Sequence, residues 1–309
     1  MPNLITHIEF AKKVYERLPD ETKKIVEGDM QAYILGSIGP DVLFALRELG
    51  IKDIERYPNL LQFMAQYESF EGMRKYQIEN PSDTRYAYML GYLCHYVADK
   101  NLHPYVNYFQ ENVLAKDMNR QEFASLHSLI ESALDTYVLI SMRGYENPNL
   151  YKPNKELKIT RKKKIEIGKI YEDVLNKIYG IPLTASQFSL SSLCTNAFMW
   201  FTNDKRRIKY KLVRNFEKKH LSSQKVTCLF RPVARYDEVD YLNLEKRPWR
   251  KVRNRADLIN LSAVETFEVA VEEASKYYLP SFHASVSNDV PLDKDYFHIN
   301  YEGLDTTII

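Results

Sequence analysis

Apolar residues recur at intervals of three and four positions through most of the first 280 residues of the chain, and glycine and proline are few. This spacing gathers apolar side chains on one side of an α-helix, whereas a half-buried β-strand needs alternation, which no stretch shows convincingly. The sequence therefore predicts an all-α protein, a multi-helix bundle. The expected helices cover residues 7–18, 29–38, 54–79, 83–102, 119–142, 161–179, 185–218 and 256–278.

Short motifs predict where several of these helices begin and end. Thr6 with Glu9 has the spacing of a capping box, in which two side chains satisfy main-chain N–H groups at a helix start. A second capping box, Asn119 with Glu122, is expected at the start of the fifth helix. Pro104 is expected to end the fourth helix, because proline has no N–H to donate.

The length of 309 residues suits one large domain or two modest ones, and a hydrophobic fraction of 45% allows a substantial core. We expect residues 1–218 to form one helical domain. Residues 219–309 are expected to be an extension packed on the same domain, with a long irregular loop and one final helix. Its tail beyond Pro280 is expected to lie along the surface.

The charge balance and the cysteines narrow the choice of partners and compartment. A formal net charge of +2 gives no whole-molecule attraction to nucleic acid, so no stable nucleic-acid partner is expected. Three cysteines, far apart and never in a CxxC spacing, indicate neither a disulfide framework nor a thiolate zinc site. The first 13 residues are too charged for a signal peptide, and no apolar run reaches the ~18 residues of a membrane span. We expect a soluble, cytoplasmic protein.

Three basic runs could meet phosphates of a lipid or a nucleic acid locally. They lie at residues 161–164, 205–207 and 247–255. Solvated helix faces usually explain such runs, so both interpretations stay open.

Histidine and carboxylate side chains recur along two of the expected helices. His95, Asp99 and His103 lie at positions i, i+4 and i+8 and project from one stripe. His127 and Glu131 repeat the i, i+4 spacing on the following helix. Imidazole and carboxylate are the ligands that zinc accepts where thiolate is absent, so the sequence predicts a metal site between these helices.

Two simpler explanations apply to the same residues. His95, Asp99 and His103 could form a buried hydrogen-bond network, although burying so many ionisable groups without a cation is costly. His127 and Glu131, taken alone, could be an ordinary contact on a helix surface.

The ordered set of motifs resembles a known family, the zinc-dependent phospholipase C and single-strand nuclease superfamily, in its cytosolic, signal-less branch. The matching motifs are Thr6-His7, Gly36-Ser37-Ile38-Gly39-Pro40-Asp41, His95/Asp99/His103-Pro104 and His127/Glu131/Asp135. They span about residues 1–143, and the helical pattern extends the likeness to about residue 215. The resemblance implies a phospholipase C-type helical bundle with zinc between its helices.

The resemblance also implies ligands for two or three zinc ions. The implied sets are His103, His127 and Glu131 for one ion; Asp41, His95 and Asp99 for a second; and His7, with Asp99 as a bridge, for a third. Asp41 is further implied to be the catalytic general base, or the group that orients a metal-activated hydroxide. Asp135 would either orient a histidine ligand or be a solvated helix residue.

The chain departs from the family pattern in two places. Secreted members ligate a metal through the amino group of an N-terminal Trp, whereas this chain begins with Met and Pro. The family also places a His ligand between the Asp of the Gly-Pro-Asp turn and the His of the long helix, but residues 42–94 contain no His. Gln66, Tyr67 or Glu68 would take that place. A carboxylate can bind zinc, whereas an amide is a poor ligand.

The expected function is a zinc-dependent phosphoric-ester hydrolase resembling phospholipase C, in which a metal-activated hydroxide attacks phosphorus. The substrate would be a phospholipid or another phosphodiester, with peripheral membrane contact. Two alternatives stay open: a nuclease or nucleotidase on the same scaffold, and a non-catalytic, metal-stabilised helical binding module. The missing His supports the second alternative.

Overall fold

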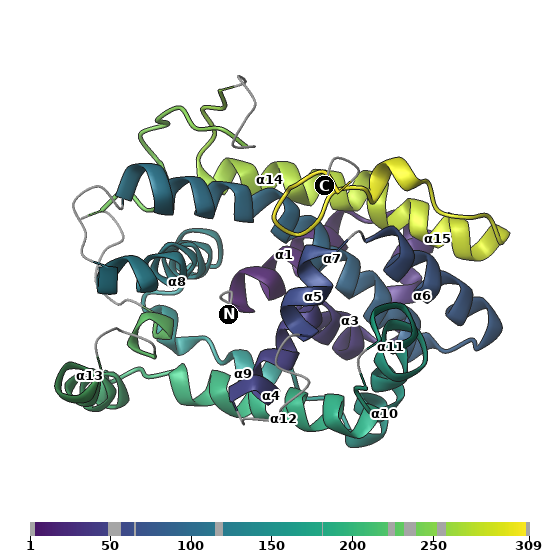
Figure 1. Ribbon diagram of the computed structural model, residues 1–309, viewed down its shortest axis with the longest axis horizontal. Helices are drawn as coiled ribbons and strands as arrows, with labels where there is room; N and C mark the ends of the chain where they lie inside the picture. The colour runs from purple at the N-terminus through teal and green to yellow at the C-terminus, as the bar shows by residue number, and fades with distance from the viewer. Residues whose placement is uncertain are drawn as a thin grey trace. The chain divides into compact units, whose positions relative to one another are not determined.

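The computed structural model describes residues 4–48, 57–64, 66–114, 120–180, 182–221, 226–231, 239–251 and 258–306. Within these ranges the regular structure is helical, and β-type pairing is limited to the isolated bridges Trp249–Ile259 and Ile299–Asp305 (Figure 1). The predicted all-α class is therefore confirmed. None of the helices in these ranges is long and apolar enough to cross a membrane.

Most helices are short, and several continue into a turn of 3₁₀- or π-helix. The first group is α1 (Leu4–Arg17), α2 (Asp20–Gly28), α3 (Met30–Gly36), a 3₁₀-helix (Gly39–Leu43), α4 (Phe44–Glu48), α5 (Tyr57–Phe63), α6 (Tyr67–Glu79) and α7 (Asp83–Tyr108) with a π-helix (Phe109–Leu114). The second group is α8 (Arg120–Tyr137) with a π-helix (Val138–Met142), a 3₁₀-helix (Pro148–Leu150), α9 (Pro153–Glu156), α10 (Arg161–Ile170), a π-helix (Tyr171–Leu175), α11 (Asn176–Tyr179) and α12 (Ala185–Thr202). The last group is α13 (Ile208–His220), a 3₁₀-helix (Thr227–Leu229), α14 (Ala263–Glu273), a π-helix (Ala274–Tyr278), α15 (Leu279–Asn288) and a 3₁₀-helix (Lys294–Tyr296).

The chain forms two compact units, each assembled from separated segments. Unit 1 comprises Met1–Thr6, Leu102–Lys155 and Ala197–Glu268, and unit 2 comprises His7–Asn101, Glu156–Asn196 and Val269–Ile309. The division expected at residue 218 stays a prediction.

In unit 2, α3 and α7 cross with their backbones in close contact, and two glycines make this possible. A Cβ atom on Gly36 would lie 2.2 Å from the main-chain oxygen of Tyr88. A Cβ atom on Gly91 would lie 2.0 Å from the main-chain oxygen of Tyr33. Because no side chain fits at either position, this crossing fixes the turn that follows α3 against α7.

Two predicted helix ends are wrong. The first helix begins at Leu4 instead of His7, and the main-chain N–H of Thr6 donates to Asp135 Oδ1 at 2.7 Å, so Thr6 and Glu9 form no capping box. α7 continues through Pro104 to Tyr108. Proline removes one hydrogen bond from a helix but keeps a helical φ, and the buried side chains of Leu102 and Tyr105 hold the next turn in place. The second predicted capping box, at residues 119–122, lies outside the described side chains.

The predicted helix at residues 54–79 is split into α5 and α6. Between them the Gln66 Nε2 atom donates to the main-chain oxygens of Leu61, at 2.8 Å, and Met64, at 2.7 Å. A side chain that bonds nearby main-chain groups competes with helix formation, which explains the break.

The predicted helix at residues 185–218 is also split, into α12 and α13. Arg207 has φ of 59°, in the left-handed region, so the helix cannot run through it. Asp204 Oδ2 then accepts from the main-chain N–H of Tyr210 at 2.8 Å, which supplies an acceptor to the first turn of α13.

The C-terminal segment differs from the expected surface tail. The final helix does not end at Pro280: α14 continues through the π-helix Ala274–Tyr278 into α15, and the proline lies in the first turn after the π-helix. Beyond that helix Leu292, Phe297 and Tyr301 are buried. The tail is therefore part of the packing of unit 2.

The crossing of α3 and α7 predicts that Gly36→Ala destabilises the protein. The added Cβ would overlap main-chain atoms, and overpacking of this kind costs about 1–3 kcal/mol in the free energy of unfolding. Urea denaturation measures the loss. Gly28→Ala is the matched control, because its Cβ would meet only Asp83 Cβ at 3.8 Å. An equal stability change in the two variants would contradict the account.

Candidate functional site

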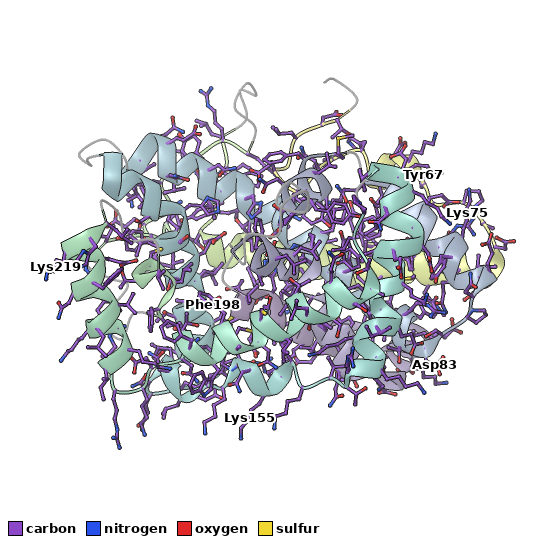
Figure 2. The ribbon with its side chains drawn as sticks, turned by 60° about the horizontal axis from the view of Figure 1, so that its bottom comes forward. Tyr67, Lys75, Asp83, Lys155, Phe198 and Lys219 are labelled. Carbon is purple, nitrogen blue, oxygen red and sulfur yellow. The ribbon has the colours of Figure 1, made fainter. Side chains whose placement is uncertain are left out.

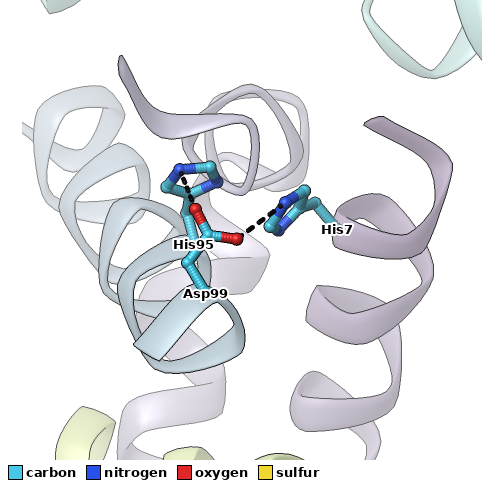
Figure 3. Close-up of side chains that lie close together, drawn as sticks. All are labelled: His7, His95 and Asp99. Atoms are coloured by element: carbon cyan, nitrogen blue, oxygen red, sulfur yellow. Dashed lines mark ion pairs between the residues drawn. The ribbon is translucent and has the colours of Figure 1, made fainter. Parts of the chain in front are cut away.

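Three ligand-type side chains converge in unit 2. The Asp99 carboxylate lies between two imidazoles, with Oδ1 3.2 Å from His7 Nε2 and Oδ2 3.1 Å from His95 Nε2. Figure 3 shows His95 and Asp99 extending from α7 and His7 from α1. All three residues are buried, and one ligand atom from each lies within 4.8 Å of the others.

The turn after α3 holds the His95 ring in place. Gly39 has φ of 55°, and a Cβ there would lie 2.5 Å from His95 Cδ2, so the turn packs directly on the imidazole. His95 Nδ1 lies 3.2 Å from the main-chain oxygen of Ser37. Because a carbonyl oxygen can only accept, Nδ1 carries the proton of this hydrogen bond, and Nε2 is the ring nitrogen that faces Asp99.

Asp41 lies beside this triad without joining it. Its Oδ1 is 3.9 Å from His95 Nε2 and accepts a hydrogen bond from Gln62 Nε2 at 2.7 Å. Burial raises the pKa of Asp41 to about 6, against the lowering effect of His95. Asp41 Oδ2 is buried and has no hydrogen-bond partner among the described residues.

Gln62 is the residue that sequence reasoning missed. It lies four residues before Gln66 in the sequence. Because the helix is broken between α5 and α6, Gln66 does not lie on the same helix face as Gln62. Glu68 is exposed, so it does not take the place of the missing His. The α5 side chain that contacts Asp41 is therefore an amide, not an imidazole or a carboxylate.

The C-terminal segment closes over the same region of unit 2. The main-chain N–H of Tyr301 donates to the Gln62 main-chain oxygen at 3.1 Å, and the Tyr301 ring lies 5.5 Å from that of His95 between centroids. Asn300 Nδ2 donates to the Phe63 main-chain oxygen at 3.2 Å. These contacts hold the tail against α5 and cover one side of the His95 ring.

A second triad forms in unit 1. Glu131 Oε1 lies 3.0 Å from His127 Nε2, on the same helix, and 3.9 Å from His103 Nε2, on α7. Burial raises the pKa of Glu131, whereas nearby positive groups, with His127 and His103 among them, lower it, and the net shift is downward. Glu131 Oε2 is buried without a hydrogen-bond partner among the described residues. A buried carboxylate oxygen that accepts no hydrogen bond can bind a cation.

Asp135 takes neither of its two expected roles. Its Oδ1 accepts from the main-chain N–H and, at 2.6 Å, from the hydroxyl of Thr6. Thr6 directly precedes His7 in α1. Asp135 therefore anchors the start of α1 instead of orienting a histidine ring.

The two triads fit zinc in their donor chemistry and spacing. Ligand atoms about 2.0–2.2 Å from a tetrahedral zinc ion lie roughly 3.3–3.6 Å from one another. The measured separations to the carboxylates, from 3.0 to 3.9 Å, bracket this value. His95 Nε2, like Glu131 Oε2, is buried without a hydrogen-bond partner among the described residues.

The sequence model of the zinc dependent phospholipase C family matches residues 6–186, more than half of the chain. The chain therefore belongs to the zinc dependent phospholipase C family. Both triads lie inside the matched range, and the family implies zinc. Comparisons with curated proteins and with solved structures gave no match.

The buried Asp135 predicts a pH-dependent contribution to stability. Burial raises its pKa to about 7, from an ordinary value of 3.8. A carboxyl whose pKa is raised by folding stabilises the folded state below the ordinary pKa, and this contribution is lost as pH rises through about 7. Asp135→Asn keeps an acceptor for Thr6 and does not ionise. Its free energy of unfolding, relative to wild type, should therefore rise between about pH 5 and pH 8.

Urea denaturation at both pH values measures this difference. The exposed Asp295, changed to Asn, is the control and should follow the wild type. The same pH dependence in wild type and Asp135→Asn would contradict the assignment.

Proposed function

We propose that this protein is a zinc-dependent phosphoric-ester hydrolase resembling phospholipase C, with one zinc ion in each triad. The observation that carries the proposal is the convergence of imidazoles and carboxylates twice in one chain, all of them buried except the partly exposed His127. Burying so many ionisable side chains is unfavourable unless a cation compensates them. Zinc supplies Lewis acidity, which lowers the pKa of water and stabilises negative charge on phosphoryl oxygens.

Asp41 is the proposed catalytic residue. It is a buried carboxylate beside the first triad, and a carboxylate so placed can take up a proton from water. The Gln62 amide holds Oδ1 of Asp41, so Oδ2 is the atom left to accept a proton from water. Asp41 would act as the general base or orient the attacking water.

The proposed substrate class is a phospholipid or another phosphodiester, which the family membership supports. A nuclease or nucleotidase is the nearest enzymatic alternative. Hydrolysis of a phospholipid, a single-stranded oligonucleotide and a chromogenic phosphodiester by the same preparation separates these activities. We further propose a cytoplasmic location, supported by the three free cysteines Cys94, Cys194 and Cys228.

His127→Ala should remove one zinc ion per chain and reduce hydrolysis roughly a hundredfold or more, because it deletes a ligand and leaves Glu131 without its partner. Elemental mass spectrometry gives the zinc content, and the chromogenic assay gives the rate.

His298→Ala is the control for this substitution. The His298 ring contacts only a main-chain oxygen, that of Asp295, in the described structure, so zinc content and rate should not change. Full activity of His127→Ala with one zinc ion lost would rule out a catalytic role for that ion.

One observation favours a second candidate, a non-catalytic binding module stabilised by metal. The Gln62 amide donates a hydrogen bond to Asp41. The family pattern leads us to expect a histidine ligand in this part of the chain, and an amide is a poor zinc ligand. A triad of His7, His95 and Asp99 can still hold an ion that stabilises the fold. Zinc bound at both triads with no hydrolysis of any of the three substrates would support this candidate.

Gln62→His tests how far the amide weakens the site. The imidazole would add a donor beside Asp41, so we expect the protein to retain more zinc under mild chelation. The control is Glu68→His, which adds a histidine at an exposed position of the next helix. Equal zinc retention in both variants and in wild type would contradict the proposed role of Gln62.

A further inference from the structure

Helix α13 presents a stripe of large apolar side chains to solvent. Ile208, Leu212 and Phe216 are 55%, 67% and 58% exposed. They are spaced four residues apart, so they lie on one side of the helix. An exposed apolar stripe of this size on a single helix indicates an interaction surface.

The other side of α13 attaches the helix to unit 1 through polar contacts. Glu217 is buried, and its Oε1 accepts from the main-chain N–H of Val226 at 2.6 Å. The Tyr210 ring packs against Phe230 with centroids 5.8 Å apart. At about 100° per residue, Glu217 and Tyr210 lie roughly opposite the apolar stripe. The stripe is therefore not what holds the helix in place.

Positive charge is concentrated on and beside this helix. Residues 205–220 contain eight Lys and Arg residues and one acidic residue, in a chain of formal net charge +2. The basic residues are Lys205, Arg206, Arg207, Lys209, Lys211, Arg214, Lys218 and Lys219. By helical position, Lys211 and Lys218 flank the stripe on one side and Lys209 on the other. Figure 2 labels Lys219 on the same helix.

An exposed tryptophan stands at the start of the stripe. Trp200, in α12, is 62% exposed, and the Lys209 ammonium lies 4.8 Å from the centroid of its ring. Lys209 Nζ also donates to the Trp200 main-chain oxygen at 3.1 Å. These contacts place the indole beside α13. Tryptophan with neighbouring lysine is typical of side chains that sit at a membrane–water interface.

We propose that α13 and Trp200 form a docking surface for an anionic lipid bilayer. The apolar stripe would enter the headgroup region, and the flanking lysines would meet lipid phosphates. A nucleic acid would use the charge but would not need the exposed aliphatic side chains of Ile208 and Leu212. This surface lies outside the family match at residues 6–186 and contains no triad residue, so it does not depend on the proposed hydrolysis.

Vesicle flotation tests the proposal. Wild-type protein should float with phosphatidylcholine vesicles that contain phosphatidylserine at least about fivefold more than with phosphatidylcholine alone, and high salt should reduce this binding. The double substitution Leu212→Asp with Phe216→Asp should lower binding by about tenfold or more. Lys211→Glu with Lys218→Glu should lower binding to the anionic vesicles only. Circular dichroism and zinc content should stay unchanged in both double variants.

Two matched substitutions control for surface chemistry elsewhere. Val269→Asp removes a 51% exposed apolar residue of α14, and Lys24→Glu reverses an exposed charge of α2. Both should bind vesicles as the wild type does. Absence of wild-type binding to the anionic vesicles would overturn the proposal, as would undiminished binding by the folded Leu212/Phe216 variant. A stripe-dependent dimer, or oligonucleotide binding, without vesicle binding would overturn it in favour of that partner.

Discussion

The burial of ionisable side chains around α7 is the constraint on which the rest of the structure depends. His7, His95 and Asp99 are 3%, 0% and 2% exposed, and burying ionisable side chains at such depth is costly. The close approach of α3 to α7 at Gly36 and Gly91 sets the turn that packs on the His95 ring. Such burial occurs at two places in the chain, and a divalent cation at each would compensate its energetic cost.

The first triad is in contact with two features that lie outside its own ligand set. Gln62 donates to Asp41, and Tyr301 packs beside His95, so a tail and an amide occupy positions close to the ligand cluster. Both features immobilise the side chains around the triad. Two groups of His and carboxylate side chains among the described residues are close enough to hold a metal ion, which is why we propose two ions, one per triad.

The sequence predicted which His and carboxylate side chains of one helix lie together, and missed the contacts that depend on tertiary packing. The i, i+4 spacing of His95 with Asp99 is a property of one helix, and it required no knowledge of the fold. The position of His7 beside that pair depends on how α1 packs. Only the family resemblance predicted that His7 belongs to the site. Gln62 was missed because a side-chain bond of Gln66 breaks the predicted helix and shifts the register. Pro104 and Pro280 were read as helix ends because local propensity was weighed without the packing that overrides it.

The most direct test of the account is anomalous X-ray diffraction at the zinc absorption edge, from crystals of protein purified without chelator. The account predicts two anomalous peaks per chain. One should be bounded by His7, His95 and Asp99, and the other by His103, His127 and Glu131. Crystals supplied with zinc that show no peak at either triad would contradict the central claim, because the buried imidazoles and carboxylates would then be compensated by something other than a metal ion.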